Sequence, residues 1–179
     1  MKKINKGLIL TIIVVAILTI YIINLEKCRN AEKGNINQVC EQFINFVDGY
    51  LETGKGLERL NELMIPNKEV VQMQEKFLKT TAKKLQSEDL TITNIEKGII
   101  RITGYTFDSD QVTVSLETTV IVSGKYLDEN KKEKEAQNSL TNVYDDIILQ
   151  QVDGEWKIVQ SDLRYVDYSA YYEDTIFMY

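Results

Sequence analysis

Histidine is absent from this chain of 179 residues, which contains only two cysteines and one proline. The absence of histidine excludes Ser-His-Asp and Cys-His catalytic arrangements and imidazole metal ligands. Cys28 and Cys40, the two cysteines, cannot supply a four-thiolate zinc site. The sequence also lacks a Walker phosphate loop and a G-x-G-x-x-G fingerprint. We therefore expect no metal and no cofactor.

Positive charge is also in short supply, with 21 Lys and Arg against 27 Asp and Glu and a pI near 4.9. Nucleic-acid binding needs clustered basic residues, so we expect no nucleic-acid partner. The net charge of −6 is unevenly distributed. Residues 1–25 contain three lysines and no acidic residue, so the remainder of the chain carries −9.

A long uncharged run occupies residues 7–25, GLILTIIVVAILTIYIINL. As a helix it would span roughly 28 Å, close to the thickness of a bilayer's hydrocarbon core. Tyr21 and Asn24 lie near its far end, where amphipathic and polar groups meet lipid headgroups. The run predicts a transmembrane helix, and with it a membrane partner for the chain.

Two other interpretations of this segment are less favoured. A cleaved signal peptide has a shorter apolar region and a cleavage site flanked by small residues, which residues 24–28 do not offer. A lipidated Cys28 would normally follow a small residue, whereas Lys27 precedes it.

The lysine distribution predicts the orientation of this helix. Lys2, Lys3 and Lys6 precede the span, and a domain of charge −9 would be repelled by an anionic inner leaflet. We expect residues 1–6 to be a cytoplasmic stub. The domain is then extracytoplasmic, and the protein a single-pass protein of the cell membrane.

Residues 26–35 are polar and are predicted to form a short tether, after which the periodicity is helical. Three helices are expected, at 36–54, 57–64 and 67–86, with Gly54 ending the first and Asn67 capping the third. The residues expected to face inward are Ile36, Val39, Cys40, Phe43, Val47 and Tyr50 in the first helix, Leu57, Leu60, Leu63 and Met64 in the second, and Val70, Met73, Phe77, Leu78, Thr81 and Leu85 in the third.

From residue 89 onward the period changes to two, which predicts strands. Leu90 and Ile92 open the first strand, which resumes at Ile99 after an irregularity at residues 96–98. Residues 111–126 alternate most clearly, and a charged loop is expected at 128–138. Two strands, 140–152 and 155–163, flank Asp153-Gly154, a strong hairpin signal.

Helices followed by an antiparallel meander of about four strands predict an α+β domain at residues 36–164, with the helices packed on one face of the sheet. A domain of this length can bury one core. A tyrosine-rich tail, residues 165–179, follows it.

The ending of the domain, LQQVDGEWKIV at residues 149–159, resembles the closing hairpin of the NTF2-like superfamily, also called cystatin-like α+β rolls. The resemblance implies three helices on a curved sheet that together enclose a cone-shaped cavity. The membrane-anchored layout is similar to extracytoplasmic domains of conjugation and type IV secretion scaffolds, and to a domain that precedes an amidase in exported proteins of Gram-positive bacteria. This superfamily includes enzymes and non-enzymes, so the fold does not define an activity.

Isomerases and dehydratases of the resembled superfamily place an Asp with a Tyr or a His inside the cone, and only the Tyr version is open to this chain. The available residues are Asp48, Asp145, Asp146, Tyr50, Tyr105, Tyr126 and Tyr144. Because no Asp lies alone in an apolar run, we expect no catalytic residues and no enzyme. The residues we expect in a pocket or interface are Tyr50, Tyr105, Tyr126, Trp156, Tyr168, Tyr171 and Tyr172.

Three further features have two interpretations each. Cys28 and Cys40 could form a disulfide after export, or Cys40 could be a buried free thiol on the apolar stripe. Lys76, Lys79, Lys83 and Lys84 could bind a polyanion, although a solvated helix face is the simpler interpretation. The tail could fold back over the domain or act as an arm that binds a partner.

The sequence thus predicts a membrane-anchored extracytoplasmic binding or scaffold domain without catalysis, in a secretion-type or cell-envelope assembly. A protein partner or self-association is expected with it. The alternative is a small-ligand binder, or an isomerase- or dehydratase-like enzyme, that uses the cone.

Overall fold

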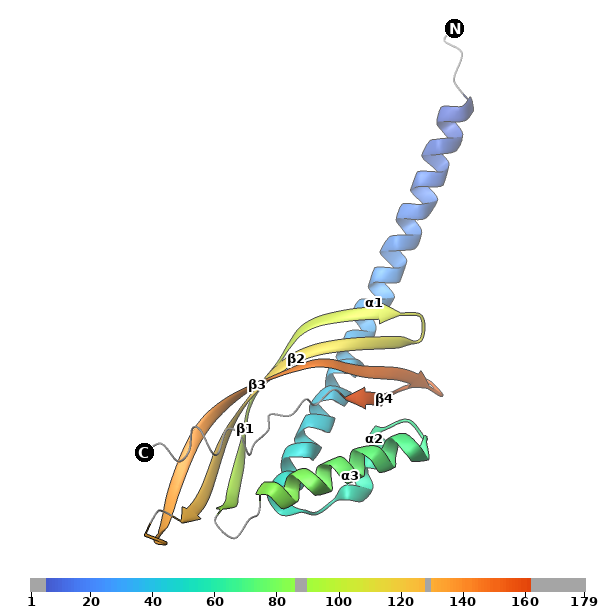
Figure 1. Ribbon diagram of the computed structural model, residues 1–179. Helices are drawn as coiled ribbons and strands as arrows, with labels where there is room; N and C mark the ends of the chain where they lie inside the picture. The colour runs from blue at the N-terminus through green and yellow to red at the C-terminus, as the bar shows by residue number, and fades with distance from the viewer. Residues whose placement is uncertain (1–5, 86–89, 128–129, 162–179) are drawn as a thin grey trace. The chain divides into compact units, whose positions relative to one another are not determined.

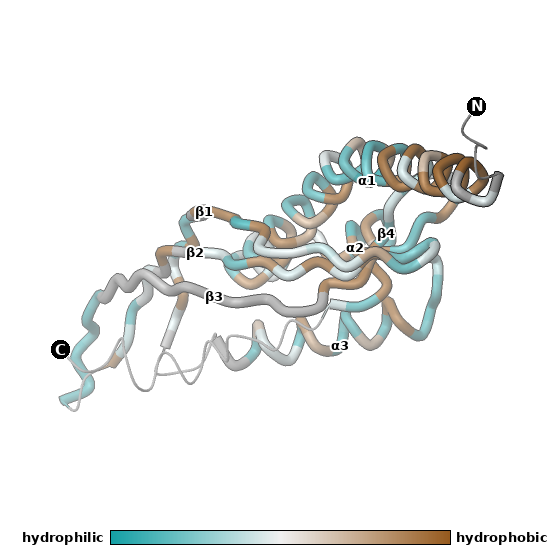
Figure 2. Tube along the Cα trace, turned by 90° about the horizontal axis from the view of Figure 1, so that it is seen from above, coloured by the Kyte–Doolittle hydropathy of each residue, from teal (hydrophilic) through white to brown (hydrophobic). Residues whose placement is uncertain are grey.

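The computed structural model describes residues 6–85, 90–127 and 130–161, and the chain divides into two units, residues 1–37 and 38–179. In the first unit, residues 6–37 are helical throughout, as the first part of α1 (Lys6–Thr53). This helix is long and apolar enough to cross a membrane, and none of its most apolar stretch is buried. Brown, the colour of hydrophobic residues, predominates in this part of α1 near the N-terminus in Figure 2. These properties indicate a membrane anchor.

The second unit is an α+β domain, as predicted. The end of α1 is followed by the 3-10 helix η1 (Leu57–Arg59), α2 (Leu60–Leu63) and α3 (Lys68–Leu85). The strands β1 (Leu90–Asp108), β2 (Gln111–Leu127), β3 (Glu133–Val152) and β4 (Glu155–Ser161) form one antiparallel sheet in the order β1-β2-β3-β4. Figure 1 shows β2 and β3 as long, bent arcs.

Local signals in the sequence explain where the helices begin and end. The backbone N–H of Gly54 donates to the carbonyl oxygen of Tyr50 (2.7 Å), and Gly54 has a φ of 67°, so α1 ends as predicted. The side-chain oxygen of Asn67 accepts from the N–H groups of Glu69 (3.0 Å) and Val70 (3.4 Å), which caps α3.

The core is built on one face of the sheet. Along β2, Val112, Val114, Leu116 and Thr118 are buried and alternate with half-buried residues. Apolar side chains of β3 and β4 and of all three α-helices complete the core, and the largest of them include Phe43, Leu60, Leu78, Ile147 and Leu149.

The closing hairpin connects the sheet to the helices. Asp153 and Gly154 have φ values of 52° and 84°, the positive angles that a two-residue hairpin requires. On β4, the carbonyl oxygen of Ile158 accepts from the N–H of Ile65 (2.9 Å). The ammonium group of Lys157 donates to the carbonyl oxygen of Glu62 (2.8 Å). The predicted hairpin is therefore confirmed, and β4 holds the segment between α2 and α3 against the sheet.

Two predicted irregular segments are regular in the structure. The expected tether, residues 26–35, is helical within α1. Its residues are mostly compatible with a helix, Gly34 costs only about 1 kcal/mol, and the side chains of Lys33 and Asn30 are hydrogen-bonded (2.8 Å). Residues 133–138 of the expected charged loop belong to β3, where Lys125 pairs across the strands with Glu133 (2.8 Å).

One residue of α3 that was predicted to face inward does not. Met73 is 68% exposed, whereas Val71 and Leu78, seven residues apart, are buried. The buried stripe of α3 is thus narrower than predicted, and Val70, Phe77 and Thr81 are only half-buried. The predicted irregularity at residues 96–98 is confirmed by a register shift between Lys97 and Ile100.

Thr118 provides a test of the core. Its side chain is buried on β2, and its hydroxyl oxygen has no hydrogen-bond partner among the described residues. Replacing the hydroxyl with a methyl group removes a desolvation cost without changing the shape, so Thr118→Val should stabilise the fold by about 1 kcal/mol. Urea unfolding of the full-length protein in detergent, followed by Trp156 fluorescence, measures the change.

Leu116→Ala, two residues away on the same face of β2, serves as the matched control. It should destabilise the domain by about 2–5 kcal/mol, because it leaves a cavity. A loss of stability in Thr118→Val would mean that its hydroxyl is satisfied in the folded protein.

Candidate functional site

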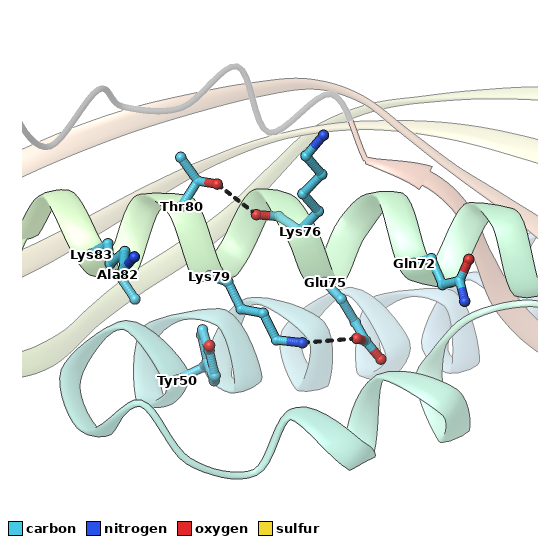
Figure 3. A pocket seen from close by; sticks show the side chains of 8 residues that line it. All are labelled: Tyr50, Gln72, Glu75, Lys76, Lys79, Thr80, Ala82 and Lys83. Carbon is cyan, nitrogen blue, oxygen red and sulfur yellow. Dashed lines mark hydrogen bonds and ion pairs between the residues drawn. The ribbon is translucent and has the colours of Figure 1, made fainter.

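A groove of about 760 Å³ runs between the end of α1 and one side of α3 (Figure 3). Only Tyr50 comes from α1, and the other lining residues come from α3. The groove is lined by Tyr50, Gln72, Glu75, Lys76, Lys79, Thr80, Ala82 and Lys83. We call it the α1–α3 groove.

Tyr50 is held rigidly in the last turn of α1. Its side chain is 6% exposed, and its ring lies 6.3 Å from that of Phe46 in a tilted arrangement. The backbone carbonyl oxygen of Tyr50 accepts the hydrogen bond from the N–H of Gly54 that ends α1, and this bond fixes the backbone at Tyr50. Tyr50 is therefore fixed in place, and only a small part of it is open to the groove.

The α3 residues of the groove follow helical spacing. Gln72, Lys76 and Lys83 lie four and seven residues apart and so share one side of the helix, with Glu75 and Lys79 beside them. The hydroxyl of Thr80 donates to the backbone carbonyl of Lys76 (2.8 Å). The wall that α3 contributes is thus polar. The surface is concave because α3 runs beside the end of α1.

The electrostatics of the groove are dominated by lysine. Lys79 forms an ion pair with Glu75 (3.2 Å), and these side chains are 58% and 30% exposed. Within the part of the chain that the structure describes, Lys76 and Lys83 are in no ion pair. In Figure 3 the side chain of Lys76 extends away from the Glu75–Lys79 pair. Two of the lysines in the lining, Lys76 and Lys83, therefore have no ion-pair partner among the described residues.

The predicted lysine cluster thus coincides with this groove, since Lys76, Lys79 and Lys83 line it. The side chain of Lys84 lies outside the described residues. A pattern of lysines on a helix does not reveal whether their surface is flat or concave, and the concavity comes from Tyr50 on a different helix.

Three of the other predicted pocket residues, Tyr105, Tyr126 and Trp156, are described by the structure, and they do not line this groove. Tyr105 is half-buried on β1 and stacks on Phe107, with ring centroids 6.2 Å apart. Trp156 is buried on β4, and Tyr126 is half-buried near the far end of β2. The partner of Tyr105 on β2 is Val114, twelve residues from Tyr126 and thus roughly 40 Å along the strand.

Several predicted residues cannot be placed. Tyr168, Tyr171 and Tyr172 lie in the tail, outside the described residues. The side chains of Tyr144, Asp145 and Asp146 are also outside what the structure describes, although their backbone belongs to β3.

The burial of Asp48 was not predicted from the sequence. Its side chain is 3% exposed, and it is the one buried carboxylate among the described residues. The signal was available, because Ile44 and Leu51, at positions i−4 and i+3, are both buried and lie on the same face of α1. Asp48 does not line the α1–α3 groove.

The two cysteines are free, and both lie in α1. Twelve residues of unbroken helix rise by roughly 18 Å, whereas a disulfide joins Cα atoms about 4.4–6.8 Å apart. Cys40 is buried and Cys28 is exposed. Burial, with a smaller contribution from the charge of Glu41, raises the pKa of the Cys40 thiol to about 12.

The two thiols should therefore differ in reactivity. At pH 8 a maleimide should modify Cys28 of the folded protein and leave Cys40 unmodified, because the thiolate is the reacting species. Because the folded-state pKa of Cys40 is raised, its contribution to stability is present below about pH 9 and is lost as the pH rises toward 12.

Mass spectrometry counts the adducts before and after denaturation. One adduct is expected on the folded protein and two after unfolding. Cys28→Ser should remove the adduct that forms on the folded protein. Rapid modification of Cys40 in the folded protein would contradict its burial.

Comparisons with known proteins leave the function open. No family model matches the chain. No curated protein matches it either. The crystal structure of the intermembrane space region of the chloroplast protein ARC6 aligns with a TM-score of 0.48 and 13% identity, over 75% of this chain and 93% of that one. A putative calcium/calmodulin-dependent protein kinase II association domain from Xanthomonas campestris aligns with a TM-score of 0.26 and 18% identity, over 68% and 81%.

Proposed function

We propose that this protein is a single-pass membrane protein whose extracytoplasmic domain binds or scaffolds other molecules without catalysis. The observation that carries the proposal is the uncharged run of residues 7–25, which forms the exposed first part of a helix that leads into an α+β domain. Lipid is the solvent that such a helix requires. The domain is thereby attached to a membrane surface.

Charge supports the orientation. Three lysines precede the span and none of the first 25 residues is acidic, whereas the rest of the chain carries −9. Basic residues favour the cytoplasmic side, and an acidic domain is repelled by the anionic inner leaflet. The N-terminus is then cytoplasmic and residues 38–179 are outside.

The NTF2-like assignment remains part of the proposal. Its support is local: the helices precede a bent antiparallel sheet, and the Asp153-Gly154 hairpin has the positive φ values that the motif requires. In the NTF2-like superfamily the helices and the sheet enclose a cone-shaped cavity. If this protein were an isomerase- or dehydratase-like enzyme, its catalytic Asp would lie inside that cavity.

The described groove favours binding over acid–base chemistry. Its one carboxylate, Glu75, is paired with Lys79, and the buried Asp48 does not line it. A general acid or base needs a group positioned to exchange a proton with the substrate. A small-ligand binder is the second candidate, and the volume of the α1–α3 groove favours it.

Part of β3 has a partner strand on one edge only among the described residues, and this open edge supports the scaffold function. β4 pairs only with residues 147–152 of β3, so residues 133–146 pair with β2 alone among the described residues. Such an edge is a template for another strand. Two copies of the same edge can pair antiparallel about a two-fold axis, and membrane anchoring concentrates the copies. We therefore expect self-association.

Thiol labelling in whole cells tests the orientation. With the protein expressed in a Gram-positive host, a membrane-impermeant maleimide should label Cys28 on intact cells, because Cys28 is exposed and follows the span by three residues. Gel detection of the labelled protein in the membrane fraction provides the measurement.

Cys28→Ser is the control, and it should abolish labelling because Cys40 is buried. Labelling that occurs only after cell lysis would place the domain in the cytoplasm. Recovery of the protein from the soluble fraction would refute the anchor.

Proline substitutions on β3 test self-association. Neighbouring residues of an antiparallel strand direct their N–H groups to opposite edges, so of Thr141→Pro and Asn142→Pro one breaks the β2–β3 ladder and the other blocks only the open edge. We expect the variant that blocks only the open edge, whichever of the two it is, to keep its stability and become monomeric. Native mass spectrometry in detergent measures the oligomeric state, and urea unfolding identifies which variant is which.

Each result has a defined meaning. A wild-type protein that stays monomeric at high concentration contradicts the scaffold proposal. So does a stable proline variant that associates as the wild type does.

A further inference from the structure

We propose that the α1–α3 groove binds a phosphorylated organic molecule, with Lys76 and Lys83 as the groups that recognise the phosphate. This inference rests on the proposed binding function and names the ligand class for that site. The ligand could be a free phosphorylated metabolite or the headgroup of a lipid, since both carry the same chemistry.

The charge of the groove points to an anion. The described lining contains three lysines and one glutamate, and Glu75 neutralises only Lys79. Lys76 and Lys83 remain, in a chain whose residues after 25 carry −9. A positive concave surface in an acidic domain concentrates anions from solution. Counter-ions bound there would be displaced by a multivalent ligand.

The spacing of the two lysines suits a phosphate. Positions 76 and 83 lie two turns apart on the same side of α3, roughly 10.5 Å along the helix axis. The long, flexible side chains of Lys76 and Lys83 can converge on one phosphate group between them, or each can bind a separate phosphate group. The basic residues of the described lining are all lysines, and lysine binds phosphate as a point charge.

The size and the remaining lining indicate an organic molecule rather than bare phosphate. A volume of about 760 Å³ lies within the range of small-molecule sites. Tyr50 forms part of the groove wall, where its small exposed part can contact an apolar part of the ligand. Gln72 supplies an amide able to donate to and accept from a ligand hydroxyl.

The Glu75–Lys79 pair adds a constraint on orientation. Glu75 is half-buried on the groove wall, 3.2 Å from the ammonium group of Lys79. A phosphate placed beside Glu75 would be repelled, whereas one placed beside Lys76 or Lys83 would not. The pair therefore directs the charged end of the ligand toward the two free lysines.

The test uses the full-length protein in nanodiscs of phosphatidylcholine, with inorganic pyrophosphate as the probe and calorimetry as the readout. We expect saturable binding that weakens with added salt. The double variant Lys76→Gln/Lys83→Gln should weaken it by about tenfold or more. Trp156 fluorescence verifies that each variant is folded.

The matched control is Lys55→Gln/Lys68→Gln, which removes the same charge from exposed lysines outside the groove. It should leave the affinity within about twofold of the wild type. Equal weakening by both double variants would overturn the proposal, because it would mean that total charge alone matters. Absence of saturable binding at about 10 mM probe would overturn it as well.

A second arm identifies the source of the phosphate. In nanodiscs that contain phosphatidylglycerol, a lipid-headgroup ligand would compete and weaken pyrophosphate binding to the wild type, whereas a free metabolite site would be unaffected. Either result supports the groove as a phosphate site. Membrane fractionation and Cys28 labelling do not depend on Lys76 or Lys83, so failure of this inference is separable from failure of the proposed function.

Discussion

Burial of one face of β2 is the constraint on which the rest of the domain depends. Val112, Val114 and Leu116 direct their side chains to that face and are fully buried, as are apolar side chains of the helices and of β3 and β4. The helices must present matching apolar stripes, and this sets which sides of α1 and α3 remain outward. The α1–α3 groove exists because the polar side of α3 lies beside the last turn of α1 after both apolar stripes are buried.

Features with a local physical cause could be predicted from the sequence. Gly54 ends α1, Asn67 caps α3, and Asp153-Gly154 forms the closing hairpin, because in each case one or two residues determine the backbone geometry. The alternation along β2 likewise follows from the pleat of a strand. Features decided by distant neighbours were harder to predict. Residues 133–138 look like a loop in isolation, and they become part of β3 because residues 122–127 provide a partner strand and Lys125 provides counter-charges.

The candidate site was only half predictable, for a similar reason. Tyr50 and the lysines of α3 were both recognised in the sequence, as separate features 26 or more residues apart. Their meeting depends on how two helices pack, and helical periodicity contains no information on that. The burial of Asp48 had a local signal in Ile44 and Leu51, but the wider apolar stripe of α1 obscured it. Sequence patterns therefore identified the groups, and the packing of the core brought them together.

The contrast between the two cysteines has a consequence for oxidative damage. Peroxides attack the thiolate, and burial keeps Cys40 in its neutral form at any physiological pH. Cys28 alone can proceed to a sulfenic acid, to a mixed disulfide or to a bond with Cys28 of a neighbouring copy. Oxidants would therefore modify the chain just beyond the membrane span, while the apolar stripe that includes Cys40 stays chemically intact.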